Sequence, residues 1–324
     1  MKILVTGGAG FIGSNFVRFI LNEKNDFEII NLDLLTYAGN LENIKDILDD
    51  PRHTFIKGDI NNEQLVNSVM EDVDFVINFA AESHVDRSID NPNIFVKTNV
   101  EGTQTLLEAA KNNEIQKFLQ ISSDEVYGTL GETGYFSETN RLLPNSPYSA
   151  SKAAADLLVR AYHTTFNLPV LITRCCNNYG PYQYPEKFIP VILNNALQGN
   201  PIPVYGDGSN VREWIHVKDH CSGILTVLEK GKIGEIYNIG SNVEYTNIDL
   251  VKLILEIMGK PETLIQFVED RPGHDIRYAL DVSKIKDQLN WEPIIKFEKG
   301  IEQTINWYIN NQDWVHNVQK RESK

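Results

Sequence analysis

Short apolar runs alternate with amphipathic stretches through the first half of the chain. The apolar runs predict buried strands at Lys2–Thr6, Glu28–Leu32, Thr54–Lys57, Phe75–Phe79, Phe118–Ile121 and Val170–Arg174. Apolar residues at helical spacing predict helices between them, at Ile12–Asn22, Asn62–Met70, Asn91–Asn112 and Pro147–Phe166. Because strands that alternate with helices pair in parallel through right-handed crossovers, this order predicts an α/β fold with a doubly wound sheet. Ligands of such sheets bind beyond the carboxyl ends of the strands.

The pattern changes after about residue 174. Prolines follow one another closely, at Pro181, Pro185, Pro190, Pro201 and Pro203. A return strand is expected near Glu235–Ile239, and helices are expected at Phe188–Gln198, Lys218–Glu229, Asn247–Met258, Val282–Leu289 and Lys299–Asn310. We therefore expect residues 1–174, with the return strand, to form a nucleotide-binding domain, and residues 175–324 to form mainly a smaller mixed α/β C-terminal substrate lobe. The polar segment from Val315 onward is expected to fray.

Charge and composition narrow the classes of partner. The 324 residues include 30 Lys and Arg against 44 Asp and Glu, a net charge of −14, which argues against nucleic acid or an anionic membrane. An anionic ligand would therefore need a local basic pocket. The three cysteines (Cys175, Cys176 and Cys221) form no CxxC pair, and no apolar run reaches the roughly 20 residues of a bilayer span, so we expect a soluble, cytoplasmic protein with reduced thiols. His84 and His216 lack ligand spacing, and no metal site is expected.

A glycine-rich loop joins the first predicted strand to the first predicted helix. Gly7, Gly10 and Gly13 permit a tight turn, close approach of the backbone to a pyrophosphate, and close packing of helix on strand. Asp33 follows Gly13 by 33 − 13 = 20 residues, where a carboxylate binds the adenosine ribose and repels a 2′-phosphate. The sequence therefore predicts a Rossmann-type sheet that binds NAD⁺. Positions in the loop and at later strand ends assign further cofactor contacts to Phe11, Ile12, Asp59, Ile60, Phe79, Ala80 and Ala81.

A second motif begins a later helix. Ser146 is a candidate cap and Pro147 a first-turn residue, and Tyr148 and Lys152, four residues apart, share one helical face. The Lys152 ammonium and a positive nicotinamide ring would lower the pKa of the phenol from about 10 toward about 7, which requires about 4 kcal/mol. Ser123 lies 148 − 123 = 25 residues earlier, just past a predicted strand.

The TGGAGFIG loop, the YxxxK pair and the upstream serine together resemble the extended short-chain dehydrogenase/reductase family. Within that family, the segments at 80–88 (AAESHVDRS), 122–128 (SSDEVYG), 177–181 (NNYGP) and 270–275 (DRPGHD) resemble the nucleotide-sugar 4,6-dehydratases of bacterial rhamnose-type pathways. The resemblance covers essentially the whole chain. It implies an NAD⁺-dependent hydro-lyase that converts dTDP-glucose to dTDP-4-keto-6-deoxyglucose.

The acidic pair Asp124-Glu125 matches the needs of that reaction. Oxidation at C4 acidifies the C5 proton, whose removal needs an ionised base, and the C6 hydroxyl leaves only when it is protonated. Adjacent carboxyl groups in a low-dielectric pocket can divide their pKa values to supply both forms. The resemblance implies that Glu125 is the base and Asp124 the acid, and Ser123, Tyr148 and Lys152 complete the expected catalytic set.

The remaining assignments follow from the resemblance. Further cofactor contacts are Thr36, Ser83, Thr98, Tyr148, Lys152 and Asn178, and substrate contacts are Ser83, Ser123, Asn177, Lys187, Phe188, Pro203, Val204, Tyr205, Arg212, Asn238, Asp270, Arg271 and His274. One departure follows the Pro-Gly-His-Asp turn, which in the family is usually followed by two arginines, whereas here Ile276 precedes Arg277. A homodimer built from the Asn91–Asn112 and Pro147–Phe166 helices is also implied. The rival interpretations are a UDP-sugar 4-epimerase or decarboxylase of the same family, and a non-catalytic NAD⁺-binding regulator.

Overall fold

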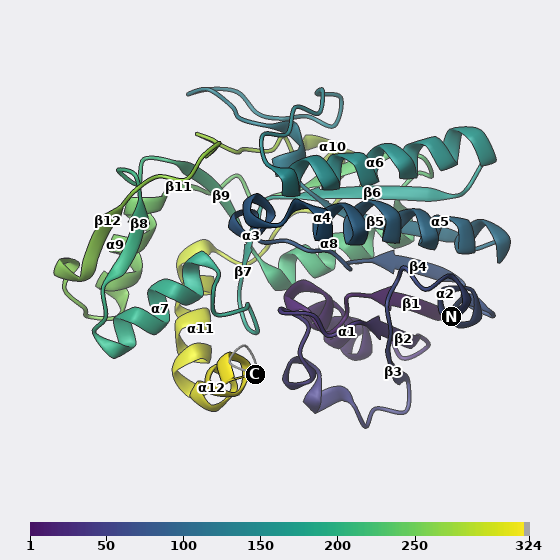
Figure 1. Ribbon diagram of the computed structural model, residues 1–324, viewed down its shortest axis with the longest axis horizontal. Helices are drawn as coiled ribbons and strands as arrows, with labels where there is room; N and C mark the ends of the chain where they lie inside the picture. The colour runs from purple at the N-terminus through teal and green to yellow at the C-terminus, as the bar shows by residue number, and fades with distance from the viewer. Residues whose placement is uncertain (321–324) are drawn as a thin grey trace.

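The computed structural model describes residues 1–320 and is organised around a parallel sheet of seven strands (Figure 1). The strand order is β10-β6-β5-β4-β1-β2-β3, and every neighbouring pair is parallel, which confirms the predicted α/β fold. The strands are β1 (Lys2–Thr6), β2 (Glu28–Asp33), β3 (His53–Lys57), β4 (Phe75–Asn78), β5 (Lys117–Ser123), β6 (Val170–Cys175) and β10 (Ile236–Ile239). The sheet is doubly wound because the chain runs outward from β1 in one direction to β3 and in the other to β10.

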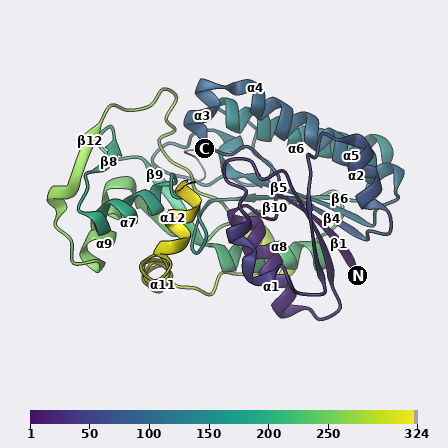
Figure 2. The same cartoon turned by 60° about the horizontal axis from the view of Figure 1, so that its bottom comes forward.

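Helices cover both faces of this sheet (Figure 2). One face carries α1 (Phe11–Glu23) and α8 (Val217–Lys230), and the other carries α2 (Glu63–Met70), α5 (Gly102–Asn112) and α6 (Pro147–Phe166). Side chains on a strand alternate between faces, so Ile3 and Val5 of β1 pack with the α1 side, whereas Leu4 packs with α2 and α5. All three are fully buried, and burial on both faces explains why the strands are continuously apolar.

The second half of the chain adds two small sheets beside the carboxyl edge of the large one. One has the order β11-β9-β7 and the other pairs β12 with β8. Their strands are β7 (Asn177–Tyr179), β8 (Ile202–Tyr205), β9 (Val211–His216), β11 (Glu244–Thr246) and β12 (Ile265–Val268). Helices α7 (Phe188–Gln198), α9 (Asn247–Ile257), α11 (Phe297–Asn310) and α12 (Gln312–Lys320) share a separate apolar core with them, and α10 (Ser283–Leu289) packs near β10. The sequence predicted only the return strand here, because strands of three to six residues leave little periodicity.

The helix predicted over Asn91–Asn112 is present as one continuous helical stretch of α4 (Pro92–Phe95), a π-helical segment (Val96–Glu101) and α5. The π segment and the short α3 (Val85–Asp90) before it were not predicted, and one other expectation was wrong. The segment from Val315 was expected to fray, but it is helical through residue 320, because α12 buries Trp314, Val315 and Val318 on one helical face. Residues 321–324 lie outside the described part of the chain.

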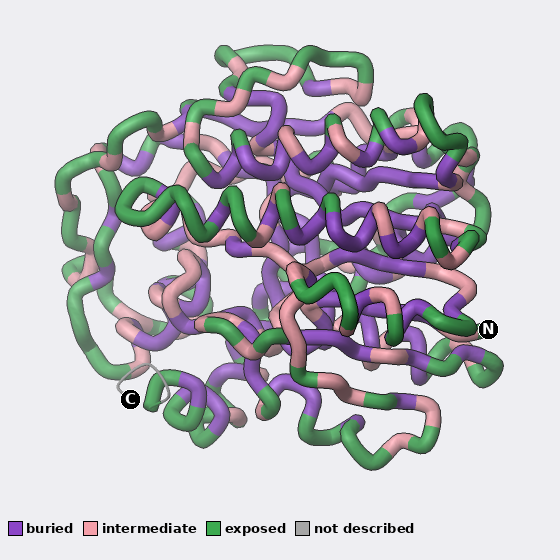
Figure 3. Tube along the Cα trace, turned by 45° about the vertical axis from the view of Figure 1, so that its right-hand side comes forward, coloured by how far each residue is buried: buried purple, intermediate pink, exposed green. Residues whose placement is uncertain are grey.

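Burial follows the layers of the fold: Figure 3 shows buried residues along the central strands and exposed ones along the outer turns of the helices. The three cysteines are buried and unpaired, as expected. Within residues 1–320, each helix lacks either the length or the apolar character that a bilayer span requires.

A buried ion pair joins α6 to the sheet and offers a test of this packing. Arg174 donates to Asp156 at 2.9 Å, and the two side chains are 3% and 1% exposed. An Asp156→Ala variant should lose about 3–5 kcal/mol of unfolding free energy, because the guanidinium stays buried without its counter-charge. Urea unfolding measures the loss. Glu292→Ala is the control, since it breaks a solvent-exposed pair with Lys286 and should leave the midpoint nearly unchanged.

Candidate active site

A cavity opens at the carboxyl ends of the central strands, where the doubly wound fold predicts a ligand. It also reaches residues of the second half of the chain. All of the expected cofactor and catalytic residues line it: Gly7, Gly10, Phe11, Ile12, Gly13, Asp33, Thr36, Asp59, Ile60, Phe79, Ala80, Ala81, Ser83, Thr98, Ser123, Asp124, Glu125, Tyr148, Lys152 and Asn178. The expected substrate residues Asn177 and Lys187 line it as well.

The glycine-rich loop between β1 and α1 leaves room for a pyrophosphate. A Cβ on Gly7, whose φ is +71°, would lie 2.6 Å from the backbone nitrogen of Ala80, and one on Gly13 would lie 2.3 Å from the Gly7 carbonyl oxygen. Any side chain there would therefore displace the loop or the helix. Helix α1 begins after Gly10, which supplies no side-chain cap, so the helix N-terminus presents its N–H groups to the cavity.

Asp33, at the end of β2, forms the acidic end of this dinucleotide cradle. Its carboxylate accepts the Ala9 N–H at 2.9 Å and the Leu35 N–H at 2.7 Å, which fix its orientation at the cavity wall. A Cβ on Gly39 would come within 2.5 Å of the carboxylate. The residues present therefore fit a dinucleotide whose ribose carries free hydroxyl groups, and the negative charge opposes a 2′-phosphate.

The acidic pair lies where β5 ends and a 3₁₀ helix, η4 (Asp124–Tyr127), begins. The Ser123 hydroxyl accepts the Glu125 N–H at 3.2 Å and donates to Oδ1 of Asp124 at 3.1 Å, so it caps the turn and orients both acids. Asp124 is only 2% exposed, and its Oδ2 atom has no hydrogen-bond partner within the described residues. A buried carboxyl oxygen facing a cavity without a partner indicates a place for a ligand.

The two acids experience different surroundings. Burial, followed by the nearby charge of Glu125, raises the pKa of Asp124 well above its usual range. Burial also raises the pKa of Glu125, but the cations of Arg271, Arg212 and Lys187 counteract that rise. Asp124 is therefore held protonated, while Glu125 is the more easily ionised member of the pair. This is the direction that a division into acid and base requires.

Tyr148 and Lys152 project from the first turns of α6, and both are buried. Ser146 and Ser149 form a capping box that fixes the start of this helix. The ammonium of Lys152 donates to the Ile121 carbonyl at 2.6 Å. The expected lowering of the Tyr148 pKa is not found: burial, followed by the charge of Glu125, raises this pKa well above its ordinary value, and the hydrogen bond to Ser123 counteracts the rise.

Three cations supply the local basic site that an acidic chain needs for an anionic ligand. Lys187 donates to the Ser83 carbonyl at 2.8 Å, and Arg212 stacks over the Tyr278 ring at 4.4 Å. Arg271 lies 3.6 Å from Asp86. Each cation is close enough to Glu125 to lower its pKa, so the three converge beside the acidic pair.

Other expected substrate residues lie away from the cavity lining. Val204 is fully buried in the core of the second half, while Pro203 and Tyr205 are exposed on the opposite face of β8. Asn238 is also fully buried, where its amide donates to the Phe136 and Asp281 carbonyls and accepts from the Tyr127 hydroxyl. Its capacity for hydrogen bonds is therefore used inside the protein.

The remaining expected substrate residues lie on the rim of the second half. Phe188 begins α7 and stacks on Trp214 with ring centroids 6.3 Å apart. Asp270 and His274 are joined by a 2.7 Å hydrogen bond, and the His274 ring meets the Tyr205 ring edge to face.

The Ile276 departure is accommodated without involving the cavity. The Ile276 side chain is 62% exposed, and its backbone N–H donates to the Thr129 hydroxyl at 2.9 Å. The following Arg277 pairs with Glu244 at 2.6 Å rather than pointing at the acidic pair.

Several lining residues were not predicted from the sequence. They are Leu32, Leu34, Ala38, Gly39, Gly58, Glu82, Ile121, Ser122, Cys175, Cys176, Gln183 and Tyr184. Cys175 was expected to serve packing alone, yet it lines the cavity, where burial raises its pKa to about 12. Gln183 and Tyr184 lie in an irregular proline-rich segment, where no periodicity marks which side chains turn inward.

The fold and the cavity together define a dinucleotide-dependent enzyme of the short-chain dehydrogenase/reductase class, with an acidic pair beside its Tyr-Lys helix. Comparison with known families gives a match over residues 4–304 to the family described as GDP-mannose 4,6 dehydratase. The chain belongs to this family of nucleotide-sugar dehydratases.

Individual relatives share about half of their residues with the chain. A dTDP-glucose 4,6-dehydratase of Xanthomonas campestris pv. campestris (strain B100) is 53% identical, over 97% of this chain and 95% of the relative. The low-salt glycan biosynthesis protein Agl12 of Haloferax volcanii is 55% identical, over 97% of this chain and 100% of the relative. The solved structure of DesIV, a dTDP-glucose 4,6-dehydratase from Streptomyces venezuelae with NAD and TYD bound, superimposes with a TM-score of 0.96 at 49% identity, over 98% of this chain and 100% of that one.

The raised pKa of Asp124 predicts how stability depends on pH. The folded state binds more protons than the unfolded state above about pH 4, so this residue lowers stability as the pH rises through that window. An Asp124→Asn variant cannot ionise there and should gain stability over the wild type at about pH 8, with the gain shrinking toward about pH 4. Urea unfolding at both pH values measures this. A difference that does not change with pH would contradict the buried, protonated carboxyl.

Proposed function

We propose that the chain is an NAD⁺-dependent dTDP-glucose 4,6-dehydratase. The observation that carries the proposal is the acidic pair at η4, whose members differ in pKa beside the Tyr148–Lys152 helix. A 4-epimerase on the same scaffold needs no such pair, because it eliminates no water. The relatives at about 50% identity named as dTDP-glucose 4,6-dehydratases support the choice of substrate.

The first task of the protein is to oxidise the sugar at C4. NAD⁺, when bound, would supply the hydride acceptor for C4 and the hydride donor for C6. Tyr148 accepts the proton of the C4 hydroxyl, and Ser123, its hydrogen-bond partner, orients that hydroxyl. Tyr148 must be a phenolate to accept this proton, and the ammonium of Lys152, one helical turn away, stabilises that anion. Burial lowers the pKa of Lys152, and the charge of Asp156 counteracts this lowering.

Elimination then uses the acidic pair. Glu125 removes the C5 proton, which the C4 ketone has made acidic, and Asp124 gives its proton to the C6 hydroxyl so that water leaves. Glu125 returns its proton to C5 as the hydride adds to C6, so the net change is loss of one water, with no oxidant consumed. Lys187, Arg212 and Arg271 would bind the diphosphate, since arginine pairs with phosphate oxygens in a bidentate manner.

A bound diphosphate would also change the acid–base step, because it would neutralise the three cations beside Glu125. The same three cations lower the pKa of Glu125, and a bound diphosphate would compete for their charge. The pKa of Glu125 should therefore rise when substrate binds, which makes it a stronger base at the moment of proton removal.

The fate of the C4 hydrogen tests the proposed reaction. Incubation with dTDP-glucose carrying deuterium at C4 should give a 4-keto product with the deuterium at C6. Deuterium that stays at C4 in an epimerised sugar would instead identify the chain as a 4-epimerase, the activity of a Bacillus cereus UDP-glucuronic acid 4-epimerase with 31% identity and a TM-score of 0.90. Parallel assays with UDP- and GDP-glucose decide the nucleobase.

A matched pair of variants separates the roles of the two acids. Glu125→Gln should lose exchange of the C5 hydrogen with solvent and slow turnover by roughly 10²–10⁴-fold, because the base is absent. Asp124→Asn should slow turnover by a similar factor yet keep C5 exchange, since only protonation of the leaving hydroxyl is lost. Mass spectrometry of sugar recovered from D₂O measures the exchange. Undiminished exchange in Glu125→Gln would remove that residue from the role of base.

We also propose a cytoplasmic homodimer that pairs through α5 and α6, as the sequence resemblance implies. Apolar side chains stand exposed along these helices and the segments before them: Leu157 is 56% exposed, Val96 48% and Ile94 40%. Exposed apolar groups on neighbouring helices favour burial against a second copy. The free, buried cysteines agree with a reducing compartment.

A further inference from the structure

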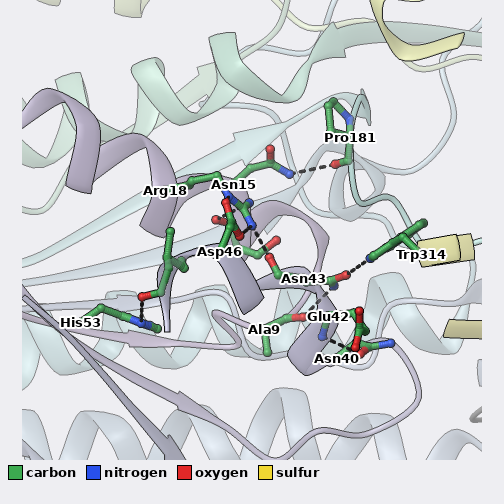
Figure 4. Close-up of polar contacts among 12 residues, drawn as sticks. Ala9, Asn15, Arg18, Asn40, Glu42, Asn43, Asp46, His53, Pro181 and Trp314 are labelled. Atoms are coloured by element: carbon green, nitrogen blue, oxygen red, sulfur yellow. Dashed lines mark hydrogen bonds and ion pairs between the residues drawn. The ribbon is translucent and has the colours of Figure 1, made fainter. Parts of the chain in front are cut away.

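Asn43 is a buried side chain at the end of a short 3₁₀ helix, η1 (Leu41–Asn43), outside the cavity lining. All of its polar groups are engaged (Figure 4). Its amide donates to the Ala9 carbonyl at 2.8 Å, and its side-chain oxygen accepts the indole N–H of Trp314 at 2.9 Å. Its backbone carbonyl accepts from Arg18 of α1, and its backbone N–H donates to Asn40. One residue therefore joins the glycine-rich loop, α1 and the C-terminal helix α12.

The contact with Ala9 bears directly on cofactor binding. Ala9 lies in the middle of the glycine-rich loop, immediately before Gly10, and is fully buried. Its carbonyl accepts a second hydrogen bond, from the Asn40 N–H at 3.0 Å, while its own N–H donates to Asp33. Since the α1 N-terminus that faces the cavity begins with this loop, the position of Ala9 sets the position of the N–H groups that would meet a pyrophosphate.

Trp314 is held in place by aromatic packing. Its ring lies among Tyr182, Trp307 and Tyr308, with centroid distances of 5.9, 5.0 and 6.1 Å. Arg18 stacks over the Tyr182 ring at 4.2 Å, which brings α1 against the same cluster. The indole N–H therefore reaches Asn43 from a fixed direction, although the two residues are 271 positions apart.

We propose that Asn43 is a positioning residue for the cofactor, and that the hydrogen bond from Trp314 of α12 holds the Asn43 side chain in its orientation. This inference rests on the proposed use of NAD⁺. The chemistry of the partners sets the amide's orientation, because a carbonyl only accepts and an indole N–H only donates. A dehydratase that returns its hydride to the sugar regenerates NAD⁺ in every turnover and gains nothing by releasing it. A glycine-rich loop that is held in position by a residue near the C-terminus would slow the release of NAD⁺.

Three variants test the proposal. Asn43→Asp keeps the shape but sets a carboxylate oxygen against the Ala9 carbonyl, so two acceptors face one another. Trp314→Phe keeps an aromatic ring but leaves the buried Asn43 oxygen without its donor. Trp307→Phe is the matched control, since it removes an indole from the same cluster without touching the Asn43 hydrogen bonds.

The measurement is the rate at which NAD⁺ leaves the holoenzyme, with released NAD⁺ trapped by excess alcohol dehydrogenase and ethanol and read as NADH absorbance. We expect release to be about tenfold faster in Asn43→Asp and roughly threefold to tenfold faster in Trp314→Phe, and nearly unchanged in Trp307→Phe. At saturating NAD⁺, KM for dTDP-glucose should stay at the wild-type value in all three.

Two outcomes would overturn the proposal: wild-type release in both Asn43→Asp and Trp314→Phe, or equal acceleration by Trp314→Phe and Trp307→Phe, which would reduce the effect to packing. Should Asn43→Asp fail to fold, the two tryptophan variants still decide. Binding of NAD⁺ by the wild type tests the proposed cofactor by itself, whereas the ratio of variant to wild-type rates tests Asn43.

Discussion

The burial of two neighbouring carboxyl groups in one turn is the constraint on which the proposed chemistry of this protein depends. Asp124 and Glu125 cannot both ionise at low cost where water is excluded, so one retains its proton. Which one does so depends on the surroundings rather than on the residues. Asp124 is enclosed beside the buried Glu213, whereas Glu125 faces three cations. The asymmetry gives one turn both an acid and a base at the same pH.

The difference between the two acids depends on cations from the second half of the chain. The parallel sheet supplies the acidic turn and the dinucleotide cradle, but Lys187, Arg212 and Arg271 come from the irregular segments and small sheets beyond residue 174. Those cations counteract the effect of burial on Glu125, so residues of the second half of the chain decide which acid ionises more easily. They do so in a chain whose net charge is −14.

Much of this was predictable from local sequence. The central strands and α6 follow from apolar periodicity and from caps such as Ser146, which act over a few residues. The dinucleotide-binding loop was predictable because its residues occur at a fixed spacing. Gly7 and Gly13 lie where a side chain would clash with the backbone, and Asp33 supplies the carboxylate at the end of β2. The proximity of Ser123 to Tyr148 was also predictable, because in a parallel sheet a strand ends and the helix that follows it begins at the same edge.

Other features were decided only by contacts between distant segments. No periodicity in the sequence predicts four of these features. They are the π-helical turn that brings Thr98 to the cavity, the cavity-facing Cys175, the buried Asn238 and the hydrogen bond between Trp314 and Asn43. The pKa of Tyr148 belongs here too, because desolvation and the charge of Glu125 act through space. The sequence by itself determined the sheet, the loop and the pair of acids, since these depend on neighbours along the chain. The burial of each titratable group and the charges near it set its pKa, and contacts between distant segments set the positions of the site residues. Both depend on neighbours in space, so only the tertiary structure decided them.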